Sequence, residues 1–517
     1  MHIGVDVGGT NTDAVLLSGH RVLASIKSPT TDDIGQGIVS AIRSILSSSG
    51  VNVSEIECVM IGTTQFTNAF VEGKKLVPVA TIRACLPATE SLAPMVDFPE
   101  HLASPIGRNS YLIKGGYEFD GREISQLDEH GVISAIHDIK RRGISSIALS
   151  CVFSPMNDKM EKRVAELIIK EAPDIRLTLS SQLGRVGLIE RENATIMNAS
   201  LTNLAETVIN AFRSALRELN INCPFYVSQN DGTLMSADYA ERYPVLTFAS
   251  GPTNSIRGAA FLSGVKDGIV VDIGGTTSDV GVLRDGFPRE TTTSVDIGGV
   301  RTNFRMPDVI AIGLGGGSIV RELSGKIMIG PDSVALNLLK EALVFGGSTL
   351  TATDIAVAAG YAEVGDKSLV AHLDKSMVHA AVELMHVMVE EAVDKMKSIK
   401  GDVPVILVGG GSILLNRKLK GASAVVKPEL SGTANAIGAG LAQVGGEVDK
   451  IYSYAETGRE IALGSAKQEA IKRAVEAGAD HSTTKIVSIE ELPLAYLPAG
   501  AVRIRAKAIG DLATKEY

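Results

Sequence analysis

Two short acidic segments carry residue types that could bind a phosphate group, and the two match each other closely. The first is Asp6-Val-Gly-Gly-Thr-Asn-Thr-Asp13, and it recurs as Asp272-Ile-Gly-Gly-Thr-Thr-Ser-Asp279. Paired glycines let backbone N–H groups approach an anion, and the threonine hydroxyls add donors. Because a carboxylate repels a phosphate, the first aspartate of each copy is better suited to hold a hydrated Mg²⁺ that contacts the phosphate.

Each copy lies between two apolar runs, which predicts a hairpin with the acidic residues at its turn. A single glycine hairpin is more often an ordinary tight turn, but two copies in register predict a duplicated fold whose halves close on one nucleotide. The candidate phosphate-binding residues of the two turns are Gly8, Gly9, Thr10, Thr12, Asp13, Gly274, Gly275, Thr276, Thr277 and Asp279.

Three further turns could contact the same nucleotide. Thr63 and Thr64 open a predicted helix after the strand 56–61, and helix N-termini with hydroxyl donors suit anions, although a plain capped helix explains them equally well. Two glycine runs would let the backbone lie flat against a base, ribose or phosphate. These runs contain Gly315, Gly316 and Gly317, and then Gly409, Gly410, Gly411 and Ser412. Together with the repeated hairpins, the second run is favoured for a nucleotide role.

Two other patterns favour a structural interpretation. The run Glu190-Arg191-Glu192-Asn193 opens a predicted long helix that ends near Leu219, and such a run is most often a solvated cap. His372, His379 and His386 recur every seven residues, about 10 Å of helix rise, whereas zinc-binding histidines on one helix usually sit three or four residues apart. Packing or surface placement is therefore favoured over a metal site.

The composition indicates a globular protein with an ample core. A chain of 517 residues is expected to form two or three domains, and 45% hydrophobic residues with a mean hydropathy of +0.18 exclude a disordered chain. The net charge of −9 argues against binding of bulk nucleic acid or anionic membranes. The four cysteines form no C-x-x-C pair, and no apolar run approaches the roughly 20 residues that span a bilayer. We expect a cytoplasmic protein with reduced thiols.

Strands alternate with amphipathic helices along the chain, which predicts an α/β fold with some parallel pairing. The return of the opening motif marks a second half. The predicted division is a first half (1–185), a second half with inserted helices and glycine loops (186–445), and a small C-terminal α+β appendage (446–517). The appendage is expected to contain a helix at 458–476 and β segments at 485–490 and 501–508.

The chain resembles the actin, sugar-kinase and Hsp70 ATPase superfamily, and more closely the hydantoinase/oxoprolinase family with its hydantoinase A-type subunits. The matching pieces follow the family's order: Asp6–Asp13, Gly62–Ala69, Glu190–Arg191, Asn230–Met235, Ser250–Pro252, Asp272–Asp279, and Asp308 through Gly313–Ser318. The resemblance implies duplicated actin-like (ribonuclease H-like) ATPase halves around a central cleft that binds ATP and Mg²⁺.

The resemblance also implies roles for particular residues. Asp6 and Asp272 would position Mg²⁺, Thr10 and Thr276 would donate to phosphate oxygens in catalysis, and Gly409–Gly411 would support the adenosine. ATP would be spent to phosphorylate the carbonyl oxygen of a cyclic amide, such as a hydantoin or 5-oxoproline, for ring opening, or to activate a ketone for carboxylation. The implied partners are a small cyclic amide or carbonyl substrate, a hydantoinase B-type subunit, and further copies of this chain in a homo-oligomer.

Two segments depart from the family pattern. Ile310 stands where family subunits usually have a histidine, two residues after the aspartate matching Asp308, and Ser333–Phe345 is expected to form a plain apolar helix. Three hypotheses stay open. They are an ATP-dependent cyclic-amide hydrolase or its ATP-using subunit, a kinase-like or carboxylase-type enzyme acting on another small metabolite, and a non-enzymatic actin- or Hsp70-like ATP switch.

Overall fold

The first acidic segment forms the predicted hairpin, and its two aspartates, Asp6 and Asp13, lie opposite each other on neighbouring strands. A third strand adds antiparallel on one side of the hairpin, and a fourth adds parallel on the other. These strands are β1 (His2–Val7), β2 (Asn11–Ser18), β3 (Arg21–Pro29) and β4 (Cys58–Thr63). The computed structural model describes residues 1–8, 11–19, 21–29, 34–119, 121–291, 294–441, 443–494 and 500–513.

The second acidic segment forms a hairpin of the same design, with Asp272 opposite Asp279. Again one strand of the hairpin has antiparallel neighbours and the other has a parallel neighbour, which leads on to a further parallel strand. The strands are β11 (Gly268–Ile273), β12 (Ser278–Arg284), β13 (Phe287–Pro288), β16 (Val309–Ile312), β19 (Val403–Val408) and β20 (Ala422–Val426). The predicted duplication is therefore confirmed at the level of strand pairing.

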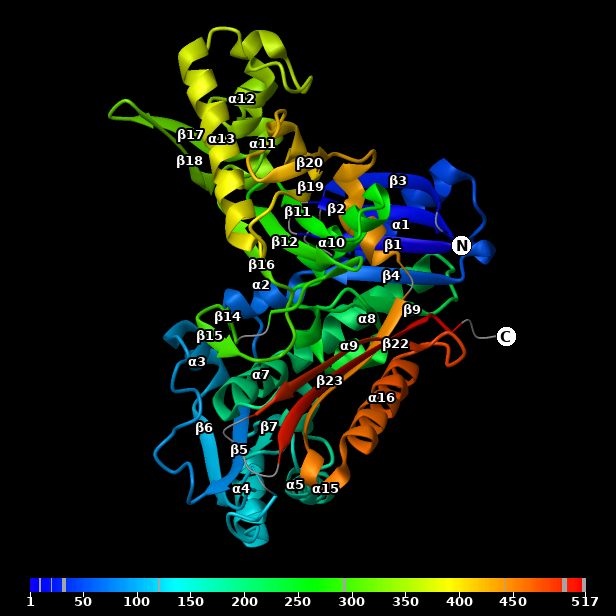
Figure 1. The fold of residues 1–517 in the computed structure, drawn as a ribbon, viewed down its shortest axis with the longest axis vertical. Coiled ribbons are helices and arrows are strands. Elements are labelled where there is room, and N and C mark those ends of the chain that lie inside the picture. Colours follow the sequence, from blue (N-terminus) through cyan, green and yellow to red (C-terminus); the bar gives the residue numbers. More distant parts are fainter. Residues whose placement is uncertain are drawn as a thin grey trace.

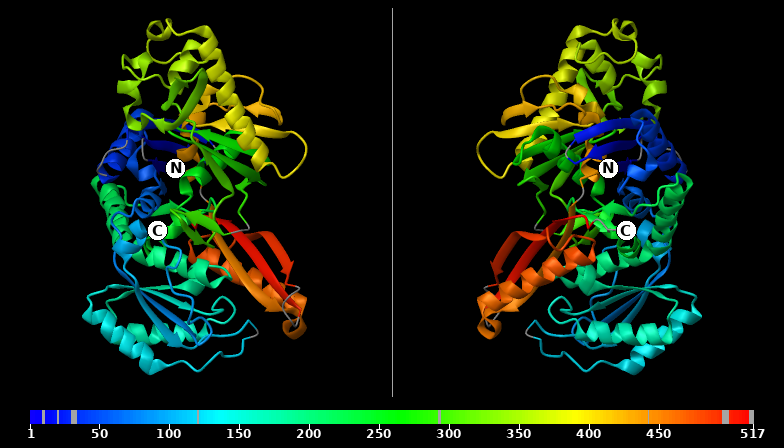
Figure 2. Two further views of the ribbon diagram at one scale, coloured as in Figure 1. Left: turned by 90° about the vertical axis from the view of Figure 1, so that its left-hand side faces the viewer. Right: turned by 90° about the vertical axis from the view of Figure 1, so that its right-hand side faces the viewer.

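The sheet of the first hairpin takes further strands from the far end of the chain. The added elements are β9 (Phe225–Ser228), β10 (Leu234–Ser236), β21 (Gln443–Ser453), β22 (Lys485–Pro493), β23 (Ala501–Asp511) and the helix α16 (Arg459–Glu476). The strand order is β22-β23-β21-β10-β9-β4-β1-β2-β3. Figure 2 shows α16 along one face of the C-terminal strands, and it buries the alanines Ala462, Ala466, Ala470 and Ala474 there.

The helix and both β segments predicted for the C-terminal part are therefore present, and they extend the sheet that contains Asp6. This sheet contains strands from all three predicted parts of the chain, and β21 spans the predicted boundary at 445. The domain boundaries at 185 and 445 stay predictions.

A smaller sheet of four parallel strands lies at one end of the molecule (Figure 1). Its strand order is β6-β5-β7-β8, and helices cover it. The elements are β5 (Val79–Leu86), β6 (Asn109–Lys114), β7 (Ser146–Cys151), β8 (Arg176–Leu179), α4 (Glu129–Arg141), α5 (Lys159–Glu171) and α7 (Leu188–Ser200). At the opposite end of the molecule lie β17 (Ser318–Leu323), β18 (Lys326–Ser333), α12 (Ala352–Ala358) and α13 (Lys375–Met396).

The remaining helices connect these sheets. The most relevant to the acidic hairpins are α1 (Ile34–Ser49), α2 (Gln65–Val71), α8 (Thr202–Glu218), α10 (Ser250–Ser263) and α14 (Ala434–Ala439). In α1 the residues Ile38, Ile42 and Ile45 are all fully buried, and their helical spacing places them on one face.

Two predicted helices differ from the structure. Ser333–Phe345 is not one apolar helix, because β18 runs to Ser333 and only short helical turns follow, including α11 (Leu338–Glu341). Leu336 and Leu339 are 62% and 67% exposed, so the segment buries no continuous apolar face that would stabilise a longer helix. The long helix expected from Glu190 is broken at Leu201, between α7 and α8.

Candidate nucleotide-binding site

The first aspartates of the two hairpins are linked through side chains of two helices. Asp6 accepts hydrogen bonds from the amide of Asn254 on α10 at 3.4 Å and from the amide of Asn435 on α14 at 3.5 Å. The side-chain oxygen of Asn435 accepts from the Ser255 hydroxyl, which also donates to Asp272. The two hairpins therefore meet at one place.

Four carboxyl groups gather there, with Lys27 as a neighbouring ammonium group 3.1 Å from Asp13. Burial and the charge of Asp13 raise the pKa of Asp6 to about 7, and burial and the charge of Asp272 raise the pKa of Asp279 to about 7. Burial also raises the pKa of Asp13, against the opposing charge of Lys27, and that of Asp272, against its hydrogen bond from a serine. The site thus carries more negative charge than its surroundings neutralise.

A magnesium ion fits this cluster if water and phosphate complete its coordination. In the part of the chain that the structure describes, no three His, Cys, Asp or Glu side chains are grouped to hold a metal by themselves. Oδ1 of Asp13 is buried and has no hydrogen-bond partner among the described residues. Mg²⁺ usually keeps several waters and is held by one or two carboxylates plus phosphates, which suits Asp6 and Asp272.

Both hairpin turns are closed by the same backbone hydrogen bond. The N–H of Gly8 donates to the carbonyl of Asn11 at 3.0 Å, and the N–H of Gly274 donates to the carbonyl of Thr277 at 2.9 Å. The repeat in sequence is thus also a repeat in local geometry.

The second turn presents backbone donors that have no backbone partner in the described part of the chain. The N–H groups of Gly275, Thr276 and Thr277 donate to no backbone acceptor within the described ranges. Consecutive N–H groups of this kind form a concavity that attracts anions. Gly9 and Thr10, the matching residues of the first turn, lie outside the described residues.

The first glycine run holds the second turn in place. Gly315, Gly316 and Gly317 are buried against it, and the N–H groups of the last two donate to the carbonyls of Gly274 and Gly275 at 3.0 and 2.7 Å. A Cβ on Gly315 would lie 2.6 Å from the backbone of Gly275, so a side chain does not fit. Because Gly316 and Gly317 donate their N–H groups to the turn, this run would position the turn rather than contact a phosphate itself.

The second glycine run lies directly beside Asp272, because β19 pairs in parallel with β11. Gly409 has a φ of +84°, and a Cβ there would lie 2.3 Å from Oδ1 of Asp272. Gly410 is exposed, whereas Gly411 and Ser412 are buried. An accessible backbone segment therefore adjoins the carboxylate.

The predicted threonines differ in how far a ligand could reach them. Gly62 lies opposite Asp6 on the neighbouring strand, which brings the following turn to the first hairpin. Thr12 and Thr63 are buried, at 1% and 0% exposure, whereas Thr64 is half-buried. Only Thr64 of these three is accessible to a bound molecule.

Sequence reasoning missed Asn254, Ser255 and Asn435. A signal for the two asparagines was present, because Ser250-Gly-Pro-Thr-Asn-Ser-Ile256 and Ser431-Gly-Thr-Ala-Asn-Ala-Ile437 share the pattern S-G-x-x-N-x-I. This second internal repeat places both asparagine amides on Asp6.

The charged run at the start of α7 is buried, so the prediction of a solvated cap is wrong. Arg191 and Glu192 are 1% and 0% exposed. Glu192 forms an ion pair with Arg83 of β5 and accepts a hydrogen bond from Ser150 at 2.7 Å. The partner that neutralises Glu192 is far away in sequence, and the pair fastens α7 to the smaller sheet.

Two other sequence patterns also have structural roles. Ile310 lies on β16 and packs against the apolar core of the second half, while Asp308 is paired with Arg289, whose Nε lies 3.0 Å away. His386 is fully buried, and its Nδ1 lies 2.8 Å from the carbonyl of Val382, which confirms the predicted packing role.

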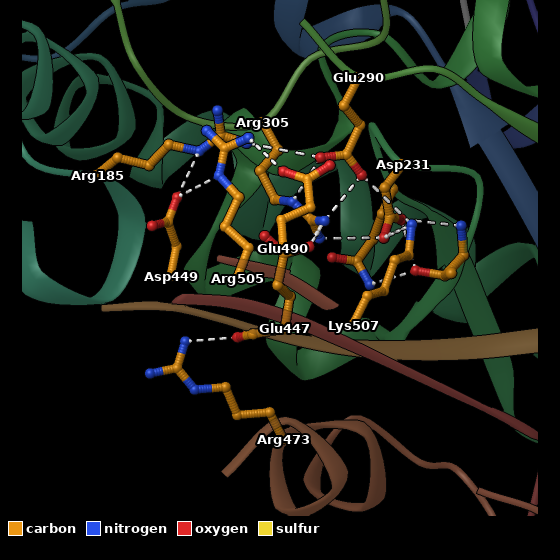
Figure 3. Close-up of polar contacts among 12 residues, drawn as sticks. Arg185, Asp231, Glu290, Arg305, Glu447, Asp449, Arg473, Glu490, Arg505 and Lys507 are labelled. Atoms are coloured by element: carbon orange, nitrogen blue, oxygen red, sulfur yellow. Dashed lines mark hydrogen bonds and ion pairs between the residues drawn. The ribbon is translucent and has the colours of Figure 1, made fainter. Parts of the chain in front are cut away.

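A further group of charged side chains lies between the segment before α10 and the C-terminal strands (Figure 3). Asp231 lies 3.3 Å from Arg305 and 3.0 Å from Lys507 of β23. Burial by itself would raise the pKa of Asp231, but the charges of Lys507 and Arg305 outweigh it and hold that pKa below its ordinary value. The preceding residue, Asn230, accepts a backbone hydrogen bond at the start of α10. Asn230 thus holds the start of the helix that carries Asn254, directly beside the charged group.

Comparisons with known proteins agree on one family. A family model described as the hydantoinase/oxoprolinase N-terminal region matches residues 2–172, and one described as hydantoinase/oxoprolinase matches residues 191–366. The caprolactamase subunit alpha of Pseudomonas jessenii is 27% identical over 69% of this chain and 54% of its own length. The acetophenone carboxylase gamma subunit of Aromatoleum aromaticum is 28% identical over 69% of this chain and 53% of its own length. The chain spans about half the length of these curated relatives.

Two solved structures share the fold. The ATP-dependent caprolactamase from Pseudomonas jessenii superposes with a TM-score of 0.79 at 18% identity, covering 98% of this chain and 87% of that chain. Nucleotide-free acetone carboxylase gives a TM-score of 0.71 at 18% identity, covering 99% and 88%. The predicted α/β fold with duplicated actin-like halves is therefore confirmed. Among the described residues no helix is both long and apolar enough to cross a bilayer.

Proposed function

Since the chain belongs to the hydantoinase/oxoprolinase family, we propose that it binds ATP with Mg²⁺ between its two acidic hairpins and uses it to activate a carbonyl group of a small molecule. The observation that carries this proposal is the meeting of the hairpins, where Asp6 and Asp272 are joined by two intervening side chains. Two hairpins on remote surfaces could not act on one nucleotide.

Different residues of the site would bind the phosphates, the cation and the adenosine. The free N–H groups of Gly275 and Thr276 would donate to phosphate oxygens, and Asp6 and Asp272 would accept from the waters of the cation. The accessible backbone at Gly410 would lie along the adenosine. When bound, Mg²⁺ would neutralise phosphate charge and so favour transfer of the terminal phosphoryl group.

We propose the cyclic amide as the substrate class. Transfer of the terminal phosphoryl group to the amide oxygen would break its bond to the ADP oxygen. Water would then add to the carbonyl carbon, and cleavage of the C–N bond would open the ring to an amine and an acyl phosphate. A second water would hydrolyse the acyl phosphate to a carboxylate and free phosphate. The relative named caprolactamase supports this reaction, and the relative named acetophenone carboxylase supports a second candidate, activation of a ketone for carboxylation.

Several relatives are named as subunits, which supports the proposal of a partner chain of the hydantoinase B type. In this proposal the partner supplies groups that act on the carbonyl.

The test is ATP turnover by the purified protein, alone and with panels of lactams, hydantoins, and ketones with bicarbonate. Stimulation by a cyclic amide is the expected result, and stimulation only by ketones with bicarbonate would favour the carboxylase candidate. ATP-driven assembly without any acceptor would instead indicate an actin-like switch.

Replacement of the second hairpin's first aspartate tests the site itself. We expect Asp272→Ala to lower ATP turnover at least about 100-fold, because the change removes a carboxylate that is proposed to hold the waters of the magnesium ion. Circular dichroism should be unchanged. Asp267→Ala is the matched control, since Asp267 is exposed and immediately precedes the first residue of the same strand. Retained turnover in Asp272→Ala would refute the assignment.

A further inference from the structure

The contact between the two hairpins passes through α10 and α14, which approach each other more closely than side chains normally allow. A Cβ on Gly258 of α10 would lie 1.9 Å from the carbonyl oxygen of Ala434, and a Cβ on Gly438 of α14 would lie 1.8 Å from that of Asn254. Only glycine fits at these two positions. The helices therefore hold their polar side chains in fixed places.

The same helices are fixed against the first hairpin. A Cβ on Gly4 of β1 would lie 2.3 Å from the carbonyl oxygen of Ala436 on α14. The distance between β1 and α14 is thus set by backbone contact, and Asn435 on α14 has little freedom to move relative to Asp6.

The two asparagines of the S-G-x-x-N-x-I repeat differ in one respect. Both donate to Asp6, but only Asn435 also contacts Ser255, which reaches Asp272. Asn254 therefore serves one hairpin, whereas Asn435 and Ser255 together connect both.

We propose that Asn435 and Ser255 are positioning residues that set the separation of Asp6 and Asp272, and thereby the place of the magnesium-bound nucleotide. This inference rests on the proposed function for the identity of the ligand. Because a serine hydroxyl has a single proton, Ser255 donates at any moment to one of three acceptors, which are Asp272, Asn435 and the carbonyl of Gly251. Asn435 meanwhile donates to Asp6, so the two side chains together occupy the space between the aspartates, and loss of either removes a contact that sets their separation.

The test is the affinity for Mg-ADP, measured by isothermal titration calorimetry on the full chain. The variants are Asn435→Ala, Ser255→Ala, their double variant and Asn254→Ala. We expect each of the first two to weaken binding about tenfold, because each change removes a side chain that fixes the place of one aspartate relative to the other. The affinity of the double variant for Mg-ADP should be no lower than that of the single variant with the larger effect, because both changes remove the same link between the aspartates.

Asn254→Ala is the matched control, since it removes an amide from Asp6 without touching the connection to Asp272. It should weaken binding no more than about threefold. Ser255→Thr keeps the hydroxyl and should restore most of the affinity. Thermal unfolding without nucleotide, similar in all variants, would show that the fold is retained.

Three results would overturn the inference: effects that add in the double variant, an effect of Asn254→Ala equal to that of Asn435→Ala, or unchanged Mg-ADP affinity in both single variants. If the affinities follow the expected pattern while no acceptor stimulates ATP turnover, the positioning role stands and the proposed reaction fails. If acceptors do stimulate ATP turnover but the affinity for Mg-ADP is the same in all variants, the proposed reaction stands and the positioning role fails. A wild-type chain that binds no Mg-ADP would overturn both.

Discussion

Two pairs of like charges face each other across neighbouring strands, Asp6 with Asp13 and Asp272 with Asp279. Such pairs destabilise a sheet, and burial makes the repulsion stronger. Lys27 relieves Asp13, but the pKa of Asp279 is still raised to about 7 by burial and by Asp272. A free energy cost of this kind is tolerated where a bound cation removes it, which agrees with the proposed magnesium site.

Replacement of Asp279 by asparagine should therefore stabilise the protein in the absence of nucleotide. Asp279 keeps its proton up to about pH 7 when folded, whereas the unfolded chain releases it near the ordinary value of 3.8. The carboxyl thus costs stability increasingly as the pH rises from about 4 to about 7. At pH 8 we expect Asp279→Asn to raise the free energy of unfolding by at least about 1 kcal/mol, and at pH 4 by close to zero.

The measurement is urea unfolding of both proteins at a series of pH values. A stability difference that is independent of pH, or that is largest at pH 4, would contradict the assignment. Added Mg²⁺ with nucleotide should narrow the difference at pH 8, because the bound charge then stabilises the wild-type carboxylate.

At the scale of elements, the ends of adjacent strands bring loops from distant parts of the sequence to the same carboxylates. The turn after β19 lies beside Asp272 because β19 and β11 are parallel neighbours, and the turn after β4 lies beside Asp6 for the same reason. Loops after neighbouring parallel strands collect at one edge of a sheet. The glycine runs could be found from sequence, but only the pairing decided that Gly315–Gly317 support a turn while Gly410 is exposed.

Gly409→Ala should test this arrangement. Its φ of +84° and the 2.3 Å approach of a Cβ to the Asp272 carboxylate predict a destabilisation of about 1–3 kcal/mol and weaker Mg-ADP binding. Gly410→Ala is the matched control, since nothing lies within 4 Å of its Cβ; its effect should stay within about 0.5 kcal/mol. Thermal unfolding and calorimetry measure both quantities. Equal effects of the two changes would show that the loop does not depend on this close contact.

At the scale of the whole molecule, the two ends of the chain share one sheet. The apolar core beneath the C-terminal strands includes Cys58 and Met60 of β4, together with Tyr226 and Leu234 of the middle strands. The charges around Asp231 add polar contacts between β23 and the rest of the molecule (Figure 3). The C-terminal strands therefore continue the sheet that contains Asp6.

A chain shortened to residues 1–442 should not fold cooperatively. The deletion removes β21–β23 and α16 and exposes a core whose large apolar side chains each contribute about 1.5–3 kcal/mol, so a few of them equal a typical total stability of about 5–15 kcal/mol. We expect loss of the thermal transition and binding of a hydrophobic dye. A shortened chain that unfolds cooperatively near the wild-type midpoint would show instead that 443–517 is an independent appendage.

The amino-acid sequence alone determined the local features: both hairpins, most helices, and the family resemblance, since turn chemistry and periodicity act between near neighbours. The tertiary structure decided which of these features meet. It placed Asn435 and Ser255 between Asp6 and Asp272, buried Glu192 against Arg83, and joined the C-terminal strands to the first sheet. Those contacts depend on how distant backbone segments pack, and neither spacing nor composition records that packing.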